Sequence, residues 1–297
     1  MCYNMKKIKE VSMKKEYIIS KENSGQTVRD FLRSTLGFSA RTLKNLKYNG
    51  NITADGKAVH ANFVLQENAH LVLEFPDEVS ETITPEDIPI NIIYEDDDFL
   101  AVNKPYGMPS HPSQNHHLGT LANAVMFKYR HTPFVYRVLT RLDIDTTGVV
   151  IIAKNAVFAN SFQKCDIKKE YLAVCVGSPC PKKGTIEAPI GRAEGIIKRC
   201  VTKDGKPSLT EYEVLDENDS LSLVRAVPIT GRTHQIRVHM AHIGCPLLGD
   251  YLYGKEIPGE RTRLHCEKLT FIHPMTGKVT VLTAKVPDDI KISGISD

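Results

Sequence analysis

The sequence predicts an α+β protein built around a mixed sheet, and three observations carry this prediction. The length of 297 residues corresponds to about two domains at roughly 150 residues per domain. The composition, 41% hydrophobic and 25% charged, is that of an ordinary globular protein. After residue 90, short segments with β patterning alternate with helical pieces without a regular strand–helix–strand repeat. Such irregular alternation favours the α+β class with a mixed sheet.

Residues 16–75 are predicted to form a small domain that begins with two helices. Gln26–Leu36 has helical spacing of its apolar residues, and Ser39 is a suitable N-cap for a second helix, Ala40–Tyr48. Asn49-Gly50 is expected to end that helix. The apolar residues expected on the inner faces are Val28, Phe31, Leu32 and Leu36 in the first helix and Leu43 and Leu46 in the second.

The same domain is predicted to continue as short strands. Asn51–Ala54 and Lys57–His60 flank the turn signal Asp55-Gly56 and are expected to form a hairpin. In His70–Phe75 the apolar residues alternate, so one face of this strand should be buried.

Charge is distributed unevenly, although the net charge is only +3. Residues 1–57 contain 12 Lys/Arg and 5 Asp/Glu, a net of +7, whereas residues 58–80 have a net of −4. On the second helix, Arg41, Lys44 and Lys47 recur every three residues along one exposed side. A basic segment of this kind indicates a polyanion partner and a phosphate-binding ridge, or simply a solvated basic surface.

A linker is expected at residues 76–89, which are acidic and contain three prolines. We therefore divide the chain into an N-terminal extension (1–15), the small domain (16–75), the linker and a larger domain (90–297). The segments of the larger domain predicted as strands are Ile90–Tyr94, Phe99–Asn103, Gly148–Ala153, Tyr171–Val176, Leu209–Val214, Ser222–Pro228 and Val279–Ala284, and those predicted as helical are Leu121–Tyr129 and 156–164.

The small domain resembles the S4 RNA-binding module in its order of helix, basic helix, Asn-Gly turn and hairpin. The residues that carry this resemblance are Arg29, Phe31, Leu32, Ser39, Arg41, Leu46, Gly50, Ile52 and Gly56. It spans about 60 residues of a degenerate motif. Tyr48-Asn49 departs from the apolar–charged pair that often precedes the glycine.

Three polar stretches of the larger domain are candidates for chemistry. Asp143 and Asp145 lie in the loop 139–148, which leads into an apolar strand, and such loops often carry catalytic side chains. Residues 228–239 form a polar, loop-like stretch with two arginines, a residue type suited to gripping phosphate or carboxylate. Tyr171 opens an apolar strand behind two lysines, where packing is its ordinary role.

Together these stretches resemble the pseudouridine synthases of the RluA/RluD family. That family's signature HRLDxxTSG corresponds here to 140–148, with Thr140 and Thr147 in place of His and Ser; Ser208 replaces a common Ala. Other matching segments are 94–107, His111-Pro112, Gly119–Leu121, 169–171, Gly205-Lys206, Thr210, Tyr212, 230–239, 264–266 and His273-Pro274. The resemblance covers most of residues 90–286 and implies the pseudouridine synthase fold, a mixed, mostly antiparallel sheet flanked by helices and loops.

The resemblance also implies roles for individual residues. Asp143 would be the catalytic carboxylate, with Arg237 as the cation that keeps it ionised and Arg232 as the fallback. Tyr171 would stack on the base and take the C5 proton, although a Tyr with a pKa near 10 is a poor base. Asp145 would shape the loop. The residues expected to contact RNA are Arg141, Arg232, His234, Gln235, Arg41, Lys44 and Lys47.

The function implied is isomerisation of uridine to pseudouridine, with large-subunit ribosomal RNA as the expected substrate. Transfer RNA is an alternative substrate. A non-catalytic RNA-binding ribosome-assembly factor is a rival function, as is a carbohydrate-active hydrolase that uses Asp143 and Asp145 as an acid/base pair. The uridine itself and the route taken by Asp143, through C1′, C2′ or C6, are left open.

Several features are absent from the sequence. It has no apolar run of about 18 residues and no apolar signal region, so we expect a cytoplasmic protein without membrane association. The seven cysteines form no CxxC pair, and the histidines lack metal-binding spacing, so no metal is expected. With neither GxGxxG nor a P-loop, no cofactor is expected. RNA rather than DNA is the expected partner, and the protein is expected to be a monomer.

Overall fold

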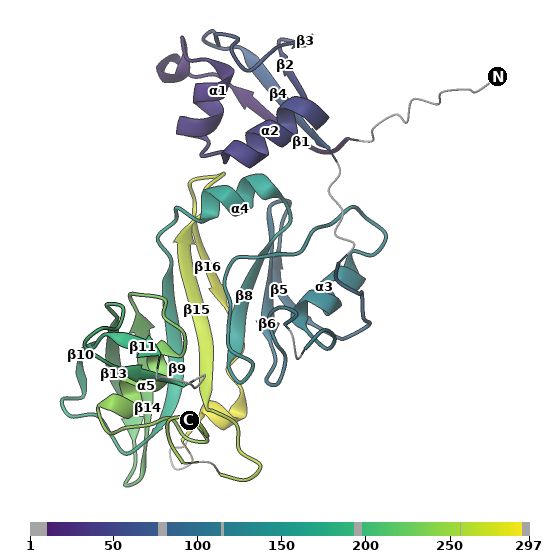
Figure 1. Ribbon diagram of the computed structural model, residues 1–297. Helices are drawn as coiled ribbons and strands as arrows, with labels where there is room; N and C mark the ends of the chain where they lie inside the picture. The colour runs from purple at the N-terminus through teal and green to yellow at the C-terminus, as the bar shows by residue number, and fades with distance from the viewer. Residues whose placement is uncertain (1–10, 77–81, 114–115, 193–197, 256, 293–297) are drawn as a thin grey trace.

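The computed structural model describes residues 11–76, 82–113, 116–192, 198–255 and 257–292, and it contains two hydrophobic cores (Figure 1). The smaller core belongs to an N-terminal unit of four strands with short helices. The larger core belongs to a unit built on a ten-stranded sheet. No helix among the described residues is long and apolar enough to span a membrane.

The N-terminal unit is an antiparallel sheet in the order β1-β4-β2-β3. Its elements are β1 (Val11–Ile18), β2 (Asn51–Ala54), β3 (Lys57–Ala58), β4 (His70–Pro76), a 3₁₀ turn (Lys21–Asn23), α1 (Val28–Asp30), a π-helical turn (Phe31–Thr35) and α2 (Ala40–Asn49). Strand β1 was not predicted, and it begins before residue 16, the expected start of this domain. Charged residues such as Lys14, Lys15 and Glu16 hide its alternation.

The predicted helix Gln26–Leu36 is wrong in its bounds and its type. It begins two residues later because Thr27 has extended backbone angles and its side chain caps Asp30 N–H. From Phe31 onward the helix widens to π spacing. By contrast, Ser39 caps α2 as expected by accepting from Thr42 N–H, and Asp55 and Gly56 adopt the positive φ values of a tight hairpin turn.

The large sheet has the order β10-β13-β14-β9-β15-β8-β6-β5, with β16 paired to β15 and β7 paired to β8. Its strands are β5 (Asn91–Glu95), β6 (Phe99–Lys104), β7 (Arg137–Val138), β8 (Thr147–Ala153), β9 (Lys168–Val176), β10 (Lys183–Glu187), β13 (Leu209–Glu217), β14 (Leu221–Pro228), β15 (Leu264–Ile272) and β16 (Val279–Thr283). Within the described chain, β8 and β15 form the single parallel pair, so the sheet is mixed and mostly antiparallel.

The remaining elements are α3 (Leu121–Lys128), α4 (Ala156–Phe162), α5 (Gln235–His242), the small pair β11 (Ile190–Arg192) and β12 (Arg199–Val201), and a 3₁₀ turn (Asp288–Ile290). The sequence prediction missed β7, β10, β11, β12 and β15. No helix was predicted over 235–242, whereas α5 begins at Gln235 and buries its first six residues. Helix α4 lies between the large sheet and the N-terminal unit (Figure 1).

Candidate active site

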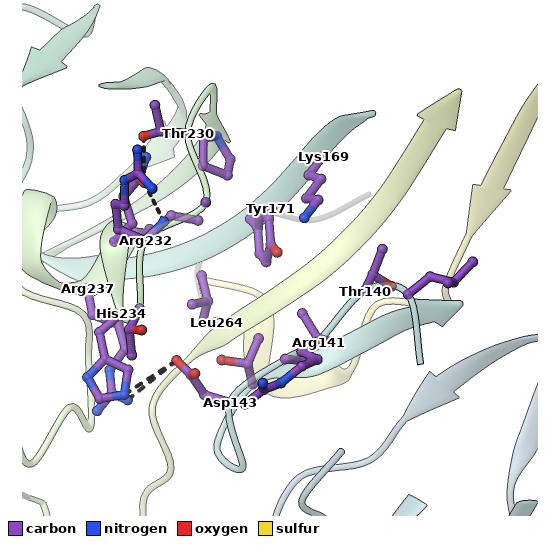
Figure 2. A pocket seen from close by; sticks show the side chains of 18 residues that line it. Thr140, Arg141, Asp143, Lys169, Tyr171, Thr230, Arg232, His234, Arg237 and Leu264 are labelled. Carbon is purple, nitrogen blue, oxygen red and sulfur yellow. Dashed lines mark hydrogen bonds and ion pairs between the residues drawn. The ribbon is translucent and has the colours of Figure 1, made fainter. Parts of the chain in front are cut away.

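A cavity of about 390 Å³ opens where three segments that are distant in sequence meet (Figure 2). They are the loop 139–146 before β8, the first residues of β9, and the turn 228–234 before α5. The structure places all the residues predicted for the site in the larger domain around this cavity: Arg141, Asp143, Tyr171, Arg232, His234, Gln235 and Arg237.

Asp143 lies in the tight turn before β8, where its backbone carbonyl accepts a hydrogen bond from Thr146 N–H (3.1 Å). Its side chain is 33% exposed and opens into the cavity. One carboxylate oxygen is 3.8 Å from His234 Nε2 and 3.9 Å from Arg237 Nη1. These are charge contacts longer than a hydrogen bond. Asp143 is therefore open to a substrate.

Arg237 is the cation facing Asp143, and it is buried in α5. Its Nε and Nη2 atoms each donate to Asp250 at 2.8 Å, a bidentate pair that fixes the guanidinium plane. The remaining nitrogen, Nη1, lies 3.9 Å from both Asp143 and Asp145. Burial lowers the pKa of Arg237, but the hydrogen bonds and charge of Asp250 outweigh this and leave it above its ordinary value. The cation is thus permanently charged and rigidly aimed.

Lys104 supports the loop that carries Asp143 and Asp145. Its fully buried ammonium donates to the carbonyls of Pro105, Met108 and Ile144 at 2.9, 2.7 and 3.3 Å. Burial lowers the pKa of Lys104 to about 7, against the charges of Asp143 and Asp145, which raise it. Because Ile144 separates those two carboxylates, Lys104 holds the backbone between them.

Asp145 is buried, and among the described residues its Oδ2 atom has no hydrogen-bond partner. Thr147 shares a hydrogen bond with His265 (2.8 Å), which joins the start of β8 to β15. Asp145 therefore lies beneath the loop, close to the cation and away from the open cavity, as a loop-shaping role requires.

Tyr171 on β9 forms an inner wall of the cavity and is 9% exposed. Burial raises the pKa of Tyr171 well above 10, and the adjacent Cys266 and the charge of Asp143 raise it further. The phenol therefore stays protonated near neutral pH. This geometry suits contact with a base better than removal of a proton.

His234 occupies a left-handed backbone conformation (φ 57°) immediately before α5. That conformation turns the ring toward Asp143, and Nδ1 lies 2.8 Å from the Tyr253 hydroxyl. Burial lowers the pKa of His234, whereas the charge of Asp143 raises it. The net direction is downward, so the imidazole is mainly neutral at pH 7.

The structure corrects the interpretation of Gln235 as an RNA-binding residue. Its amide is buried and donates to Leu209 O and Thr210 Oγ1, and it accepts from Thr230 Oγ1 and Arg232 N–H. These four hydrogen bonds use the whole capacity of the amide. Gln235 therefore shapes the turn before α5.

Two arginines lie at the surface of the cavity. Arg232 is exposed, and its Nε donates to Pro207 O (3.2 Å). Figure 2 shows Arg232 on the far side of the cavity from Asp143. Arg237, and not the fallback Arg232, is the arginine that faces Asp143. Arg141 is exposed beside Asp143, while neighbouring Thr140 is buried and accepts from Ile151 N–H (2.9 Å). Thr140 thus has a backbone-fixing role where the family usually has His.

The ridge residues Arg41, Lys44 and Lys47 are exposed on α2, outside the cavity. Their side chains point to solvent, as their spacing predicted.

Sequence reasoning missed three residues that build the site: Lys104, Asp250 and Tyr253. Asp250 and Tyr253 stand in the Gly-Asp-Tyr-Leu-Tyr-Gly run, where clustered aromatic and acidic residues were the available signal. Lys104 was detectable as a charge at the end of an apolar strand. In the described part of the chain, no three His, Cys, Asp or Glu side chains are grouped to hold a metal ion.

Comparison with known proteins agrees with this geometry. Residues 98–242 match the family model described as RNA pseudouridylate synthase. The chain is 39% identical over 276 residues to the uncharacterized RNA pseudouridine synthase YjbO of Bacillus subtilis, covering 89% of this chain and 96% of the relative. It is 34% identical over 276 residues to ribosomal large subunit pseudouridine synthase D of Xanthomonas campestris, covering 86% and 83%.

Among solved structures, the human RNA pseudouridylate synthase domain containing 1 superimposes with a TM-score of 0.59 at 29% identity, covering 68% of this chain and 85% of the human one. The sequence relatives match nearly the whole chain, and the structural relative has the same fold. The chain therefore belongs to the RNA pseudouridine synthases of the RluA/RluD type and is an isomerase that acts on RNA.

Proposed function

We propose that this enzyme converts specific uridines of large-subunit ribosomal RNA to pseudouridine, with Asp143 as its catalytic carboxylate. The observation that carries the residue assignment is the placement of Asp143, one-third exposed in the cavity and faced by the Nη1 atom of Arg237. Arg237 cannot turn away because Asp250 holds its other two nitrogens. The substrate assignment is supported by relatives named ribosomal large subunit pseudouridine synthase D.

The reaction breaks the C1′–N1 bond of uridine and forms a C1′–C5 bond, while C5 loses a proton and N1 gains one. Asp143 would attack C1′, remove a proton from C2′, or add to C6. Each of these routes needs an ionised carboxylate, which the fixed charge of Arg237 stabilises. The raised pKa of Tyr171 favours a stacking role for this residue, with the C5 proton passing to another group.

The target nucleotide would be extruded from its helix before reaction, because a stacked base cannot reach a side chain in a cavity. Arg141 is exposed at the rim next to Asp143, where its planar guanidinium suits filling the vacated stack. Arg232 and His234 line the opposite wall and would contact phosphate or the flipped nucleotide.

The N-terminal unit would act as an S4-like RNA-binding domain over residues 16–75. Arg41, Lys44 and Lys47 on exposed α2 would supply sequence-independent contacts to phosphates. The unit would thereby raise affinity without taking part in the chemistry.

Release of tritium from uridine C5 tests the reaction and the residue together. The wild-type enzyme should release tritium from deproteinised bacterial ribosomal RNA, and Asp143→Ala should reduce the rate at least about a thousandfold, as loss of a central catalytic group does. Arg232→Ala, at the same cavity but away from Asp143, should retain activity with weaker RNA binding. Release from Asp143→Ala at the wild-type rate would contradict the residue assignment.

The rival functions predict different results in the same assay. A non-catalytic assembly factor would release no tritium from any RNA. An enzyme specific for transfer RNA would release tritium from transfer RNA alone, which would overturn the ribosomal substrate.

A further inference from the structure

The N-terminal unit and the catalytic unit share a hydrophobic core contact. Val157 of α4, in the catalytic unit, is fully buried within the core of the N-terminal unit. Met275, which follows β15, packs against both cores. Figure 1 shows α4 directly beneath the N-terminal sheet and helices. The two units are therefore packed together as well as joined through the linker.

Polar contacts fix the orientation of this interface. The Lys15 ammonium pairs with Asp98 at 2.7 Å, and both side chains are mostly shielded, at 20% and 10% exposure. Asn160 of α4 donates to Thr42 Oγ1 on α2, and Ser161 donates to Leu36 O (3.1 Å). Directional bonds around an apolar contact select one arrangement of the two units.

The docked α2 lies beside the segment that leads to the active site. Arg41 is close enough to Arg137 of β7 that its charge adds to burial in lowering the pKa of Arg137. From Arg137 the chain follows β8 to Asp143, with Leu139 N–H bonded to Ile151 O on the way. Six residue steps span at most about 20 Å. The chain from Arg137, which lies beside Arg41 of the ridge, therefore reaches Asp143 within at most about 20 Å.

We propose that the docked N-terminal unit and the catalytic cavity form one rigid, composite binding face for folded RNA. The ridge Arg41, Lys44 and Lys47 would hold the phosphates of a stem, while Arg141 and Asp143 receive the flipped uridine. The α4 interface sets the spacing between ridge and cavity, so the fold of the RNA selects the target. The proposal rests on the proposed function and adds that the interface is a specificity device.

Adjacent lysines of β1 provide a matched pair of variants. Lys15→Glu places a negative charge against Asp98, whereas Lys14→Glu changes the same charge at a position 52% exposed that pairs with Glu16 on the surface. Both variants change the charge by the same amount and so weaken the attraction for RNA equally. Only Lys15→Glu opposes docking of the N-terminal unit on the catalytic unit. Small-angle scattering would measure docking, and tritium release from bacterial large-subunit ribosomal RNA would give KM and kcat.

Lys15→Glu should expand the molecule and raise KM about tenfold with kcat unchanged. The undocked N-terminal unit would no longer be held close to RNA that is bound at the cavity, so its effective concentration there would fall. Lys14→Glu should stay within about twofold of the wild type in KM, as expected for an exposed pair. Asp98→Asn, a milder change, should follow Lys15→Glu. A short single-stranded oligouridylate should react equally with all variants.

Equal KM values for Lys14→Glu and Lys15→Glu, or an expanded wild-type molecule, would overturn the composite face. Absence of tritium release by the wild type would instead contradict the proposed function, while scattering would still decide whether the units dock. Scattering and turnover together therefore distinguish failure of the composite binding face from failure of the proposed function.

Discussion

The planar guanidinium of Arg237 contacts both the residue that supports it and the carboxylates of the site. Two of its nitrogens bind Asp250, and the third faces Asp143 and Asp145 at equal distance. A guanidinium held on one edge by a bidentate carboxylate cannot rotate. The positive charge is therefore fixed beside Asp143, and in the proposed reaction it would need no reorganisation as charge develops.

Removing Asp250 should damage both stability and turnover. Asp250→Ala leaves the Arg237 cation buried without its main partner, which should lower the free energy of unfolding by about 3–5 kcal/mol. Urea denaturation measures this, and the surviving folded enzyme should show a reduced kcat. Glu217→Ala is the control, because it breaks only the exposed pair with Lys182 and should leave the unfolding midpoint close to that of the wild type. Equal unfolding midpoints for the two variants would show that the pair does not organise the site.

At this scale the sequence identified the residues that face the cavity better than those that support them. Asp143, Arg141 and Arg237 stand in dense polar motifs, and the structure brings them together. The pairing of Arg237 with Asp250 could not be read from spacing, because it depends on how the chain turns after α5. The same limit explains Gln235, whose polar character suggested RNA contact until its four internal partners were seen.

At the level of elements, the parallel contact of β8 with β15 positions the loop that carries Asp143. Gly148 is the contact point: a Cβ there would lie 2.2 Å from Cys266 O, and its φ of 118° is unfavourable for other residues. Strand β15 passes this close because Gly148 has no side chain. The close approach thereby fixes the start of β8, directly after the turn that carries Asp143.

Gly148→Ala should therefore lower the free energy of unfolding by at least about 3 kcal/mol, because backbone strain and a backbone clash act together. Thermal denaturation would measure the loss. Gly107→Ala is a suitable control, since Gly107 also has positive φ (76°) but open space where the Cβ would go. Gly107→Ala should lower the free energy of unfolding by only about 1 kcal/mol. A Gly148→Ala protein as stable as Gly107→Ala would contradict the close approach.

His265 of β15 should make this contact sensitive to acid. Burial lowers its folded-state pKa to about 4, below the unfolded value of 6.5, so the unfolded chain binds the proton first. Its contribution to stability is full above pH 6.5 and should be lost as the pH falls toward 4, by about 3 kcal/mol in all.

Urea titrations at several pH values would measure this loss. His265→Gln should flatten the dependence between pH 6.5 and 4, while His60→Gln, a change at an exposed histidine, should leave it unaltered. An equally steep loss of stability in His265→Gln would show that other groups cause it.

Elements with a regular pattern of apolar residues were predictable from the sequence, and elements that mix charged and apolar residues were not. Helix α2 and strand β8 were found because their patterns are regular and their ends carry standard signals. Strand β1 and helix α5 were missed because charged side chains interrupt both patterns. In α5 the buried polar residues Arg237 and His239 are satisfied by tertiary partners, so its burial is invisible in the sequence.

At the scale of the whole molecule, the uneven charge of the chain coincides with its architecture. Among the described residues, 11–57 hold nine Lys/Arg and four Asp/Glu, and α2 exposes three of these cations, Arg41, Lys44 and Lys47. A division into domains could be drawn from composition alone, but docking through Val157 could not, since a single valine of α4 carries no signal for its partner. The whole molecule thus places a charged surface and a cavity in fixed relation.

The ridge should contribute to RNA affinity through released counterions. Each phosphate contact steepens the fall of log K with log salt concentration by about 0.7 for single strands and about 0.9 for duplexes. Replacing Arg41, Lys44 and Lys47 by Ala should therefore flatten that slope by about 2–3, measured by filter binding of bacterial ribosomal RNA over a salt series. Lys182, Lys183 and Lys203 are equally exposed but lie near β10 and β12, so their replacement should change the slope much less. Equal slopes for both triple variants would mean that α2 attracts RNA only through the overall charge of the protein. If only the α2 variant loses salt dependence of binding and its kcat is unchanged, the basic side chains of α2 serve to capture the substrate.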